Sequence, residues 1–175
     1  MGSGIAGLLH IQLACAMGAG RVIATDIVDS RLKAAKKFGA EATIHAKENL
    51  PVRLREVNEG RLADLVIVCT GNTQAIAQGL QAVDRGGTVL IFTPKEPGST
   101  VTVSLSEFFS QNVTLTTSYA GSPADYALAL ELIKSRRICV EEMITHRLSL
   151  AETGLGFKLF TDATESLKVI VEPQK

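Results

Sequence analysis

The feature that most constrains the fold is a glycine pattern at the start of the chain, followed at a set distance by an aspartate. Gly2, Gly4 and Gly7 have the spacing G-x-G-x-x-G and precede an apolar segment, residues 5–17, that predicts a buried helix. A short β-branched run then ends at Asp26, 19 residues after Gly7. A glycine turn, a helix and an acidic strand end in this order are typical of a dinucleotide-binding unit.

Each position in the glycine pattern has a physical role in such a unit. Gly2 allows the tight turn, Gly4 lets a pyrophosphate approach the backbone, and Gly7 lets the helix pack closely on the sheet. The backbone N–H groups of Ile5 and Ala6 would point at the phosphates from the helix N-terminus. The competing interpretation is a helix N-terminus that binds no ligand.

Asp26 bears on the identity of the cofactor. Its carboxylate would accept hydrogen bonds from the adenosine ribose and would repel a 2′-phosphate, so NAD is favoured over NADP. Arg31 is close enough in sequence to flank the adenosine. The alternative is that Asp26 only ends a strand and that Arg31 lies on a solvated helix face.

The rest of the chain alternates between strand and helix patterns, which predicts an α/β fold with a doubly wound parallel sheet of the Rossmann type. The run over residues 64–70 is apolar throughout and predicts a central strand buried on both faces. Further strands are expected over residues 42–44, 88–92 and 113–118, and helices over residues 29–38, 51–57, 73–83 and 122–133, with a turn at residues 84–87.

Polar residues follow two of these strands. Cys69 and Thr70 end one buried run, and Thr93 follows the next. Ligands of open parallel sheets bind at the carboxyl ends of the strands, so both turns are candidates for dinucleotide contact. Either could equally be an ordinary strand-to-helix connection.

Composition excludes several other classes of function. The 18 Lys and Arg residues balance 18 Asp and Glu residues, and aromatic residues make up only 5%, which argues against a nucleic-acid partner. No apolar run reaches the length of about 18 residues that crosses a membrane. Three cysteines without a framework, and no secretory signal pattern, predict a cytoplasmic protein.

Six stretches of the chain resemble, in order, the coenzyme domain and tail of zinc-dependent medium-chain dehydrogenases, a family that includes alcohol, sorbitol and threonine dehydrogenases: GSGIAGLLHIQLACAMGAGRVIATD, SRLKAAKKFGA, DLVIVCTGN, AVDRGGTVLIF, LTTSY and ITHRLSL. The resemblance implies that Asp26 and Arg31 flank the ribose. It also implies that the cofactor cleft is lined by Cys69, Thr70, Thr93, Ser118 and Tyr119, and reached by Lys168.

The resemblance further implies an NAD-binding Rossmann domain over residues 1–139 and a tail over residues 140–175 that would complete a catalytic lobe. The catalytic zinc ligands of this family precede the glycine turn, and the first strand of the fold is missing as well. We identify no catalytic residue and no metal ligand here, so this chain alone is expected to be inactive. The complete enzyme would be a homo-oligomer acting on a small alcohol or polyol.

Two other functions remain open from the sequence. A non-catalytic nucleotide-binding module would keep the cleft and need no zinc lobe. A methyltransferase-type domain also uses a glycine-rich first turn and an acidic residue after the second strand, and the stretch DRGGTVLI is similar to the late turn of that fold.

Overall fold

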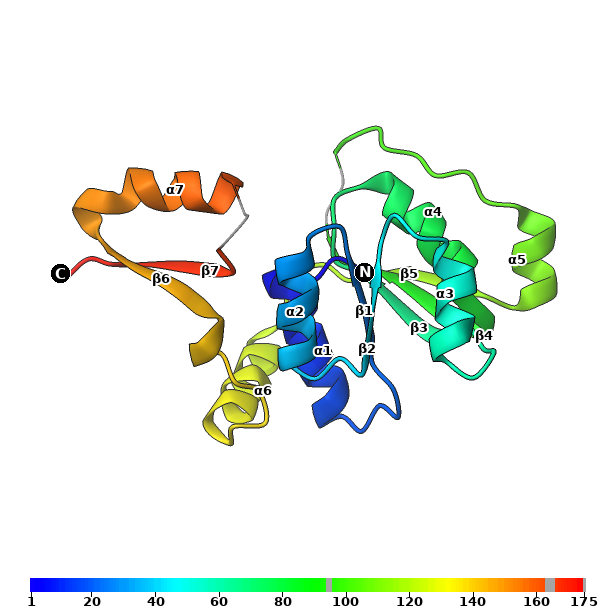
Figure 1. The fold of residues 1–175 in the computed structure, drawn as a ribbon, viewed down its shortest axis with the longest axis horizontal. Helices are drawn as coiled ribbons and strands as arrows, with labels where there is room; N and C mark the ends of the chain where they lie inside the picture. The colour runs from blue at the N-terminus through cyan, green and yellow to red at the C-terminus, as the bar shows by residue number, and fades with distance from the viewer. Residues whose placement is uncertain (94–95, 163–165, 175) are drawn as a thin grey trace.

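The computed structural model describes residues 1–93, 96–162 and 166–174 (Figure 1). Its strands form three parallel sheets. Strand β1 (Ile23–Asp26) pairs with β2 (Ala42–His45), and β4 (Val83–Ile91) lies between β3 (Ala63–Val68) and β5 (Thr114–Thr117). In the tail, β6 (Ile144–Ser149) pairs with β7 (Lys168–Glu172). The described helices are α1 (Ile5–Ala16), α2 (Asp29–Lys37), α3 (Leu50–Val57), α4 (Thr73–Ala82), α5 (Leu105–Gln111), α6 (Pro123–Lys134) and α7 (Thr153–Asp162).

The helices cover the strands in two groups, each over its own apolar cluster (Figure 1). Under α1 and α2 the cluster contains Leu8, Ile11 and Ala24. Under α3 and α4 a larger cluster includes Leu54 and Val68. This arrangement confirms the α/β class expected from the alternating pattern. None of the described helices combines the length and the apolar character needed to cross a membrane.

The expectation that residues 64–70 form a strand buried on both faces is only partly correct. Val66 and Val68 are buried, but the Leu65 side chain is 55% exposed. The reason is that β1 and β3 belong to separate sheets, and in the described residues no strand lies between them. The side of β3 that faces β1 is therefore open over most of its length.

Two local predictions differ from the structure. The expected turn at residues 84–87 lies inside β4, which follows α4 directly, and Gly86 adopts a left-handed φ of 73° there. Helix α5 was not predicted; Ser104 caps it by accepting a hydrogen bond from the Glu107 N–H. Both departures lie in short segments, which are too short for periodicity to distinguish a turn from regular structure.

The tail is joined to α1 through Gln12. The side-chain amide of Gln12 donates to the Cys139 carbonyl at 3.1 Å, and the Cys139 N–H donates to the Gln12 Oε1 at 2.7 Å. Met143 is buried in the α1–α2 cluster. Beyond it, β6, β7 and α7 stand apart from the other two sheets (Figure 1), and the large apolar side chains exposed there include Phe157 and Phe160 on α7.

Candidate functional site

The glycine turn bridges two sheets at the edge where the parallel strands end. Strand β1 ends at Asp26, and its Thr25 carbonyl accepts the Gly2 N–H at 2.9 Å. On the other side, the Cys69 N–H donates to the Met1 carbonyl at 2.8 Å, directly after β3. The turn is thus held by backbone hydrogen bonds from both β1 and β3, at the place where open parallel sheets bind their ligands.

The geometry requires glycine at Gly2 and at Gly7. Gly2 has a left-handed φ of 83°, and a Cβ there would lie 3.2 Å from both the Cys69 carbonyl and the Thr70 Cβ. A Cβ on Gly7 would lie 1.9 Å from the Gly2 carbonyl oxygen, well inside van der Waals contact. The first turn of α1 therefore packs directly against the backbone of the glycine turn.

Gly4 faces open space at the beginning of α1. It is the N-cap residue, it makes no side-chain cap, and a Cβ built on it would meet no atom within 4 Å. The N–H groups of Ile5 and Ala6 lie in the first helical turn, where no carbonyl of the same helix can accept them. No acidic side chain is found in this turn, so the positive end of α1 is available to an anion.

Asp26 is buried and organises the loops around it. Its Oδ2 accepts the Ser3 N–H at 2.7 Å, and its Oδ1 accepts the Val28 N–H at 2.9 Å. The guanidinium of Arg31 lies 3.9 Å from the same Oδ2. The sequence predicted either a ligand contact for Asp26 or a plain strand end. The structure shows that Asp26 fixes the glycine turn to the end of β1.

Ser3 was not singled out from the sequence. It is 1% exposed, and its hydroxyl donates to the Thr25 carbonyl at 3.2 Å. The available signal was its place between two glycines of the motif, where a small polar side chain can bond to an adjacent strand end.

Cys69 and Thr70 lie directly against the glycine turn. The Cys69 thiol is half-buried, and this burial raises the pKa of the thiol above its ordinary value of 9.0. The Thr70 hydroxyl oxygen accepts the Asn72 N–H at 3.4 Å, which helps to end the strand. Both residues are therefore beside Gly2, and the neutral thiol adds no charge to the site.

The remaining predicted residues differ in how near they lie to this turn. Thr93 follows β4 and donates its N–H to the Val68 carbonyl at 3.4 Å, and Ser118 follows β5 and donates its N–H to the Ile91 carbonyl at 3.4 Å. Tyr119 follows Ser118 in the sequence, but its side chain is 91% exposed. Lys168 begins β7 in the separate tail sheet, and no described contact joins it to the glycine turn.

His10 is a second residue near this edge that sequence reasoning left aside. Its ring, on α1, meets Phe92 edge to face with ring centroids 4.4 Å apart. Burial, and then the positive charge of the chain's amino group, lower the pKa of His10. A neutral imidazole therefore connects α1 with the end of β4.

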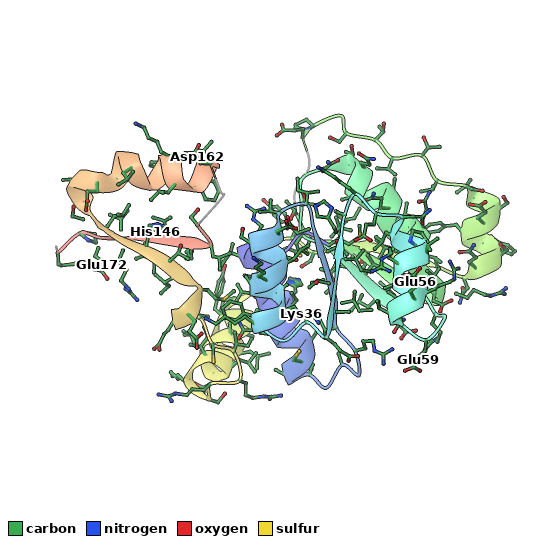
Figure 2. The ribbon with its side chains drawn as sticks, viewed as in Figure 1. Lys36, Glu56, Glu59, His146, Asp162 and Glu172 are labelled. Carbon is green, nitrogen blue, oxygen red and sulfur yellow. The ribbon has the colours of Figure 1, made fainter. Side chains whose placement is uncertain are left out.

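The described residues contain no group of three or more His, Cys, Asp or Glu side chains that could hold a metal ion. The three histidines lie on different elements: His10 lies on α1, His45 ends β2, and His146 lies on β6 in the tail. Of the three, Figure 2 labels His146. The described chain therefore offers no zinc ligand set.

Comparison with known proteins assigns the family. The sequence profile of the zinc-binding dehydrogenase family matches residues 6–135. An L-threonine 3-dehydrogenase of Bacillus subtilis (strain 168) is 32% identical over 178 residues, covering 99% of this chain and 50% of its own length. A sorbitol dehydrogenase of Gallus gallus is 28% identical, covering 98% of this chain and 48% of its own length. The structure of an alcohol dehydrogenase from Thermus sp. ATN1 has a TM-score of 0.86 at 29% identity, covering 96% of this chain and 48% of that one.

The chain belongs to the zinc-binding dehydrogenase family, since the family profile matches well over half of it. The resemblance drawn from the glycine turn and the later motifs is thereby confirmed. The chain spans about half the length of the curated relatives it matches. Membership of this family favours the dehydrogenase over the methyltransferase-type interpretation.

Proposed function

We propose that this chain is the NAD(H)-binding portion of a zinc-dependent alcohol or polyol dehydrogenase. The observation that carries the proposal is the uncapped N-terminus of α1, which opens at Gly4 beside the buried carboxylate of Asp26. The relatives are a threonine dehydrogenase, a sorbitol dehydrogenase and an alcohol dehydrogenase by name, which supports an alcohol or polyol substrate for the complete protein.

The residues present fit a dinucleotide at this edge. The N–H groups of Ile5 and Ala6 would donate to the pyrophosphate, and the open space at Gly4 would admit it. The Asp26 oxygens each accept one backbone N–H and retain a further lone pair for a ribose hydroxyl. When bound, the nicotinamide of NAD supplies the hydride acceptor of the reaction.

The chain's own residues would orient the cofactor along the edge. Asp26 and Arg31 would hold the adenosine end, next to the first turn of α1. Cys69 and Thr70 would line the middle of the cleft against the glycine turn. The proposed nicotinamide side lies toward the residues that follow β4 and β5, namely Thr93, Ser118 and Tyr119. Lys168 would join this set from the tail.

Zinc does not fit the residues described here, so no step of the reaction is assigned to zinc in this chain. We expect the metal ligands and most of the substrate pocket to come from a catalytic lobe outside this chain, with residues 1–139 binding the coenzyme and residues 140–175 completing that lobe. The 175-residue chain alone should then show no alcohol or polyol oxidation. Zinc-dependent turnover by this chain would overturn that assignment.

The test is a calorimetric titration of the chain with NADH, NADPH and S-adenosylmethionine. We expect NADH to bind at least about tenfold more tightly than NADPH, a difference of about 1.4 kcal/mol, because the Asp26 carboxylate repels a 2′-phosphate. Gly4→Val should abolish NADH binding by filling the open space, whereas Gly154→Val, at a second glycine with open surroundings, should leave it unchanged. Equal binding by both variants, or preferred binding of S-adenosylmethionine, would overturn the proposal.

A non-catalytic nucleotide-binding module is the alternative, and it predicts the same titration. The dehydrogenase portion and the non-catalytic module are distinguished by combining the chain with the catalytic lobe of a relative and measuring polyol oxidation. Recovery of NAD-dependent polyol oxidation supports the dehydrogenase portion, and its absence in a well-folded complex supports the module. We also expect the complete protein to self-associate, which sedimentation would test. We expect it to be located in the cytoplasm, which cell fractionation would test.

A further inference from the structure

The ends of β1 and β2 lie side by side, because Asp26 and His45 are the last paired residues of these two parallel strands. The imidazole of His45 makes two hydrogen bonds there. Its Nε2 lies 3.1 Å from the Ile27 carbonyl oxygen, and its Nδ1 lies 3.2 Å from the backbone nitrogen of Lys47. The ring therefore joins the segment that follows β1 to the segment that follows β2.

The two partners fix the tautomer of this imidazole. A backbone N–H can only donate, so Nδ1 must accept the Lys47 N–H with its lone pair. A carbonyl oxygen can only accept, so Nε2 carries the proton and donates it to Ile27. The ring of His45 thus has a single N–H donor, and that donor is directed at the segment after β1.

The Ile27 carbonyl and the Val28 N–H belong to one planar peptide group. In a trans peptide these two groups point in opposite directions, so a hydrogen bond to one constrains the direction of the other. The Val28 N–H donates to Asp26 Oδ1 at 2.9 Å. A single peptide group therefore links the His45 Nε2 to the Asp26 carboxylate, and hydrogen bonds connected in this way polarise one another.

The Asp26 carboxylate is held from both sides. It is 5% exposed, its Oδ2 accepts the Ser3 N–H at 2.7 Å, and the Arg31 guanidinium lies 3.9 Å from the same oxygen. The Val28 N–H holds Oδ1, and Val28 is also the N-cap residue of α2, the helix that carries Arg31. A shift of the Ile27–Val28 peptide would therefore turn the carboxylate and move the first turn of α2 at the same time.

The segment after β2 is itself fixed, so it can anchor the imidazole. The Glu48 carboxylate accepts the His45 N–H at 3.0 Å, and the Ala46 N–H donates to the backbone carbonyl of Asp26 at 2.9 Å. The side-chain amide of Gln78, on α4, donates to the Ala46 carbonyl at 3.4 Å. The ring of His45 therefore projects from a turn that contacts both β1 and α4.

We propose that His45 is a positioning residue for the adenosine end of the cofactor site. Its Nε2–H holds the Ile27–Val28 peptide, and that peptide presents the Asp26 carboxylate to a ribose hydroxyl in one orientation. This inference rests on the proposed binding of NAD(H), and His45 itself does not contact the cofactor in it.

A purely structural role would make the other contact of the ring the important one. The bond from the Lys47 N–H to Nδ1 closes the turn after β2, and it would stabilise that turn in a protein that binds no ligand. The bond from Nε2 reaches the segment after β1 and, through it, Asp26. The two roles can be separated by substitution because the two nitrogens have different partners.

The experiment compares His45→Gln with His45→Asn in the 175-residue chain. Glutamine places an N–H donor near the position of Nε2, whereas the shorter asparagine places an acceptor near the position of Nδ1 and does not reach Ile27. We expect His45→Asn to speed hydrogen exchange of the Val28 amide by at least about tenfold and to weaken NADH binding about three- to tenfold. His45→Gln should keep both within about twofold of the unsubstituted chain.

The matched control is His146→Asn, at a partly exposed histidine on β6 of the tail (Figure 2), and it should change neither measurement. If His45→Asn lowers the urea midpoint of the whole chain, His45→Met takes its place, because methionine is as long as glutamine and has no donor. Equal Val28 exchange in the donor and the non-donor variants would overturn the proposal. Weaker NADH binding in His45→Gln than in His45→Asn would overturn it as well, since the Nδ1 contact would then be the one that matters.

The exchange of Val28 is measured without cofactor, so the two proposals fail in different ways. A chain whose His45 variants differ in exchange as expected, but which binds no NADH, would contradict the proposed function and leave the link from His45 to Asp26 in place. A chain that binds NADH equally well in all His45 variants would contradict the positioning role alone.

Discussion

The backbone N–H of Ser3 donates to the carboxylate of Asp26 at 2.7 Å, and both residues are at least 95% buried. This hydrogen bond joins the glycine turn to the end of β1, two segments that are 23 residues apart. A residue that the sequence pattern assigns to ligand binding is therefore also part of the framework that positions the turn. Its substitution should affect folding as well as binding.

Asp26→Asn should lower the free energy of unfolding by about 1–3 kcal/mol. The carboxylate accepts one backbone N–H on each oxygen, and an amide has only one acceptor oxygen, so one buried donor loses its partner. Urea unfolding followed by circular dichroism measures the change. Asp29→Asn, at an exposed position in the first turn of α2, is the control and should change stability by less than 1 kcal/mol, about the value of a helix-dipole contact. Equal losses in the two variants would contradict the framework role of Asp26.

Gly7→Ala should destabilise the chain by about 1–3 kcal/mol, because the added methyl would lie 1.9 Å from the Gly2 carbonyl oxygen and force α1 away from the turn. Gly4→Ala adds the same methyl where no atom lies within 4 Å, and should cost less than about 1 kcal/mol as an N-cap change. The difference between the two urea midpoints is the test. A Gly7→Ala variant as stable as Gly4→Ala would show that the close approach is not required.

Gln12→Ala should release the tail from α1. The side chain satisfies both the N–H and the carbonyl of Cys139, and truncation leaves these groups without their partner. We expect trypsin to cut at Arg136 and Arg137 several-fold faster in this variant, since local opening exposes that segment. Gln81→Ala, on the exposed face of α4, is the matched control. Unchanged cleavage at these arginines would show that the other contacts, among them buried Met143 and the Lys37–Glu142 ion pair, hold the tail without Gln12.

The stability of the 175-residue chain should rise with pH below pH 8. Burial lowers the pKa of the Met1 amino group from its ordinary value of 8.0, so the unfolded chain binds more protons than the folded chain between the lowered pKa and 8.0. In that range the free energy of unfolding increases with pH, by at most about 1.4 kcal/mol per pH unit for one group.

The measurement is urea unfolding at several pH values between 6.5 and 8, with the N-acetylated chain as the control. The lowered pKa of His10 adds a further rise in stability near pH 6.5, where the unfolded imidazole is still partly protonated, and the raised pKa of Cys69 acts only toward pH 9. Both residues are present in the acetylated chain, so the difference between the two curves reports the amine. Acetylation removes the titrating amine and should flatten the curve. Identical slopes for the free and acetylated chains would show that the buried amine does not control the pH dependence.

The sequence predicted the elements with the clearest composition and the clearest start and end signals. The helix after the glycine turn, the strand that ends at Asp26 and the helix capped by Ser122 all occur in the structure. It did not predict α5, and it placed a turn inside β4. The burial of residues 64–70 was overestimated. An apolar run shows that a strand can be buried on both faces, but only the fold decides whether another element packs against it.

The sequence by itself determined the class of this protein, because glycine spacing, hydrophobic periodicity and an acidic strand end are local patterns set by backbone sterics and side-chain chemistry. Only the tertiary structure decided what those residues touch. It brought Asp26 to the Ser3 N–H, Gly7 to the Gly2 carbonyl and Gln12 to Cys139, and it opened a slot between β1 and β3. Apart from the local contact of Gly7 with Gly2, these contacts join residues far apart in the chain. Their partners follow from how helices and strands pack in three dimensions, which periodicity along the chain does not encode.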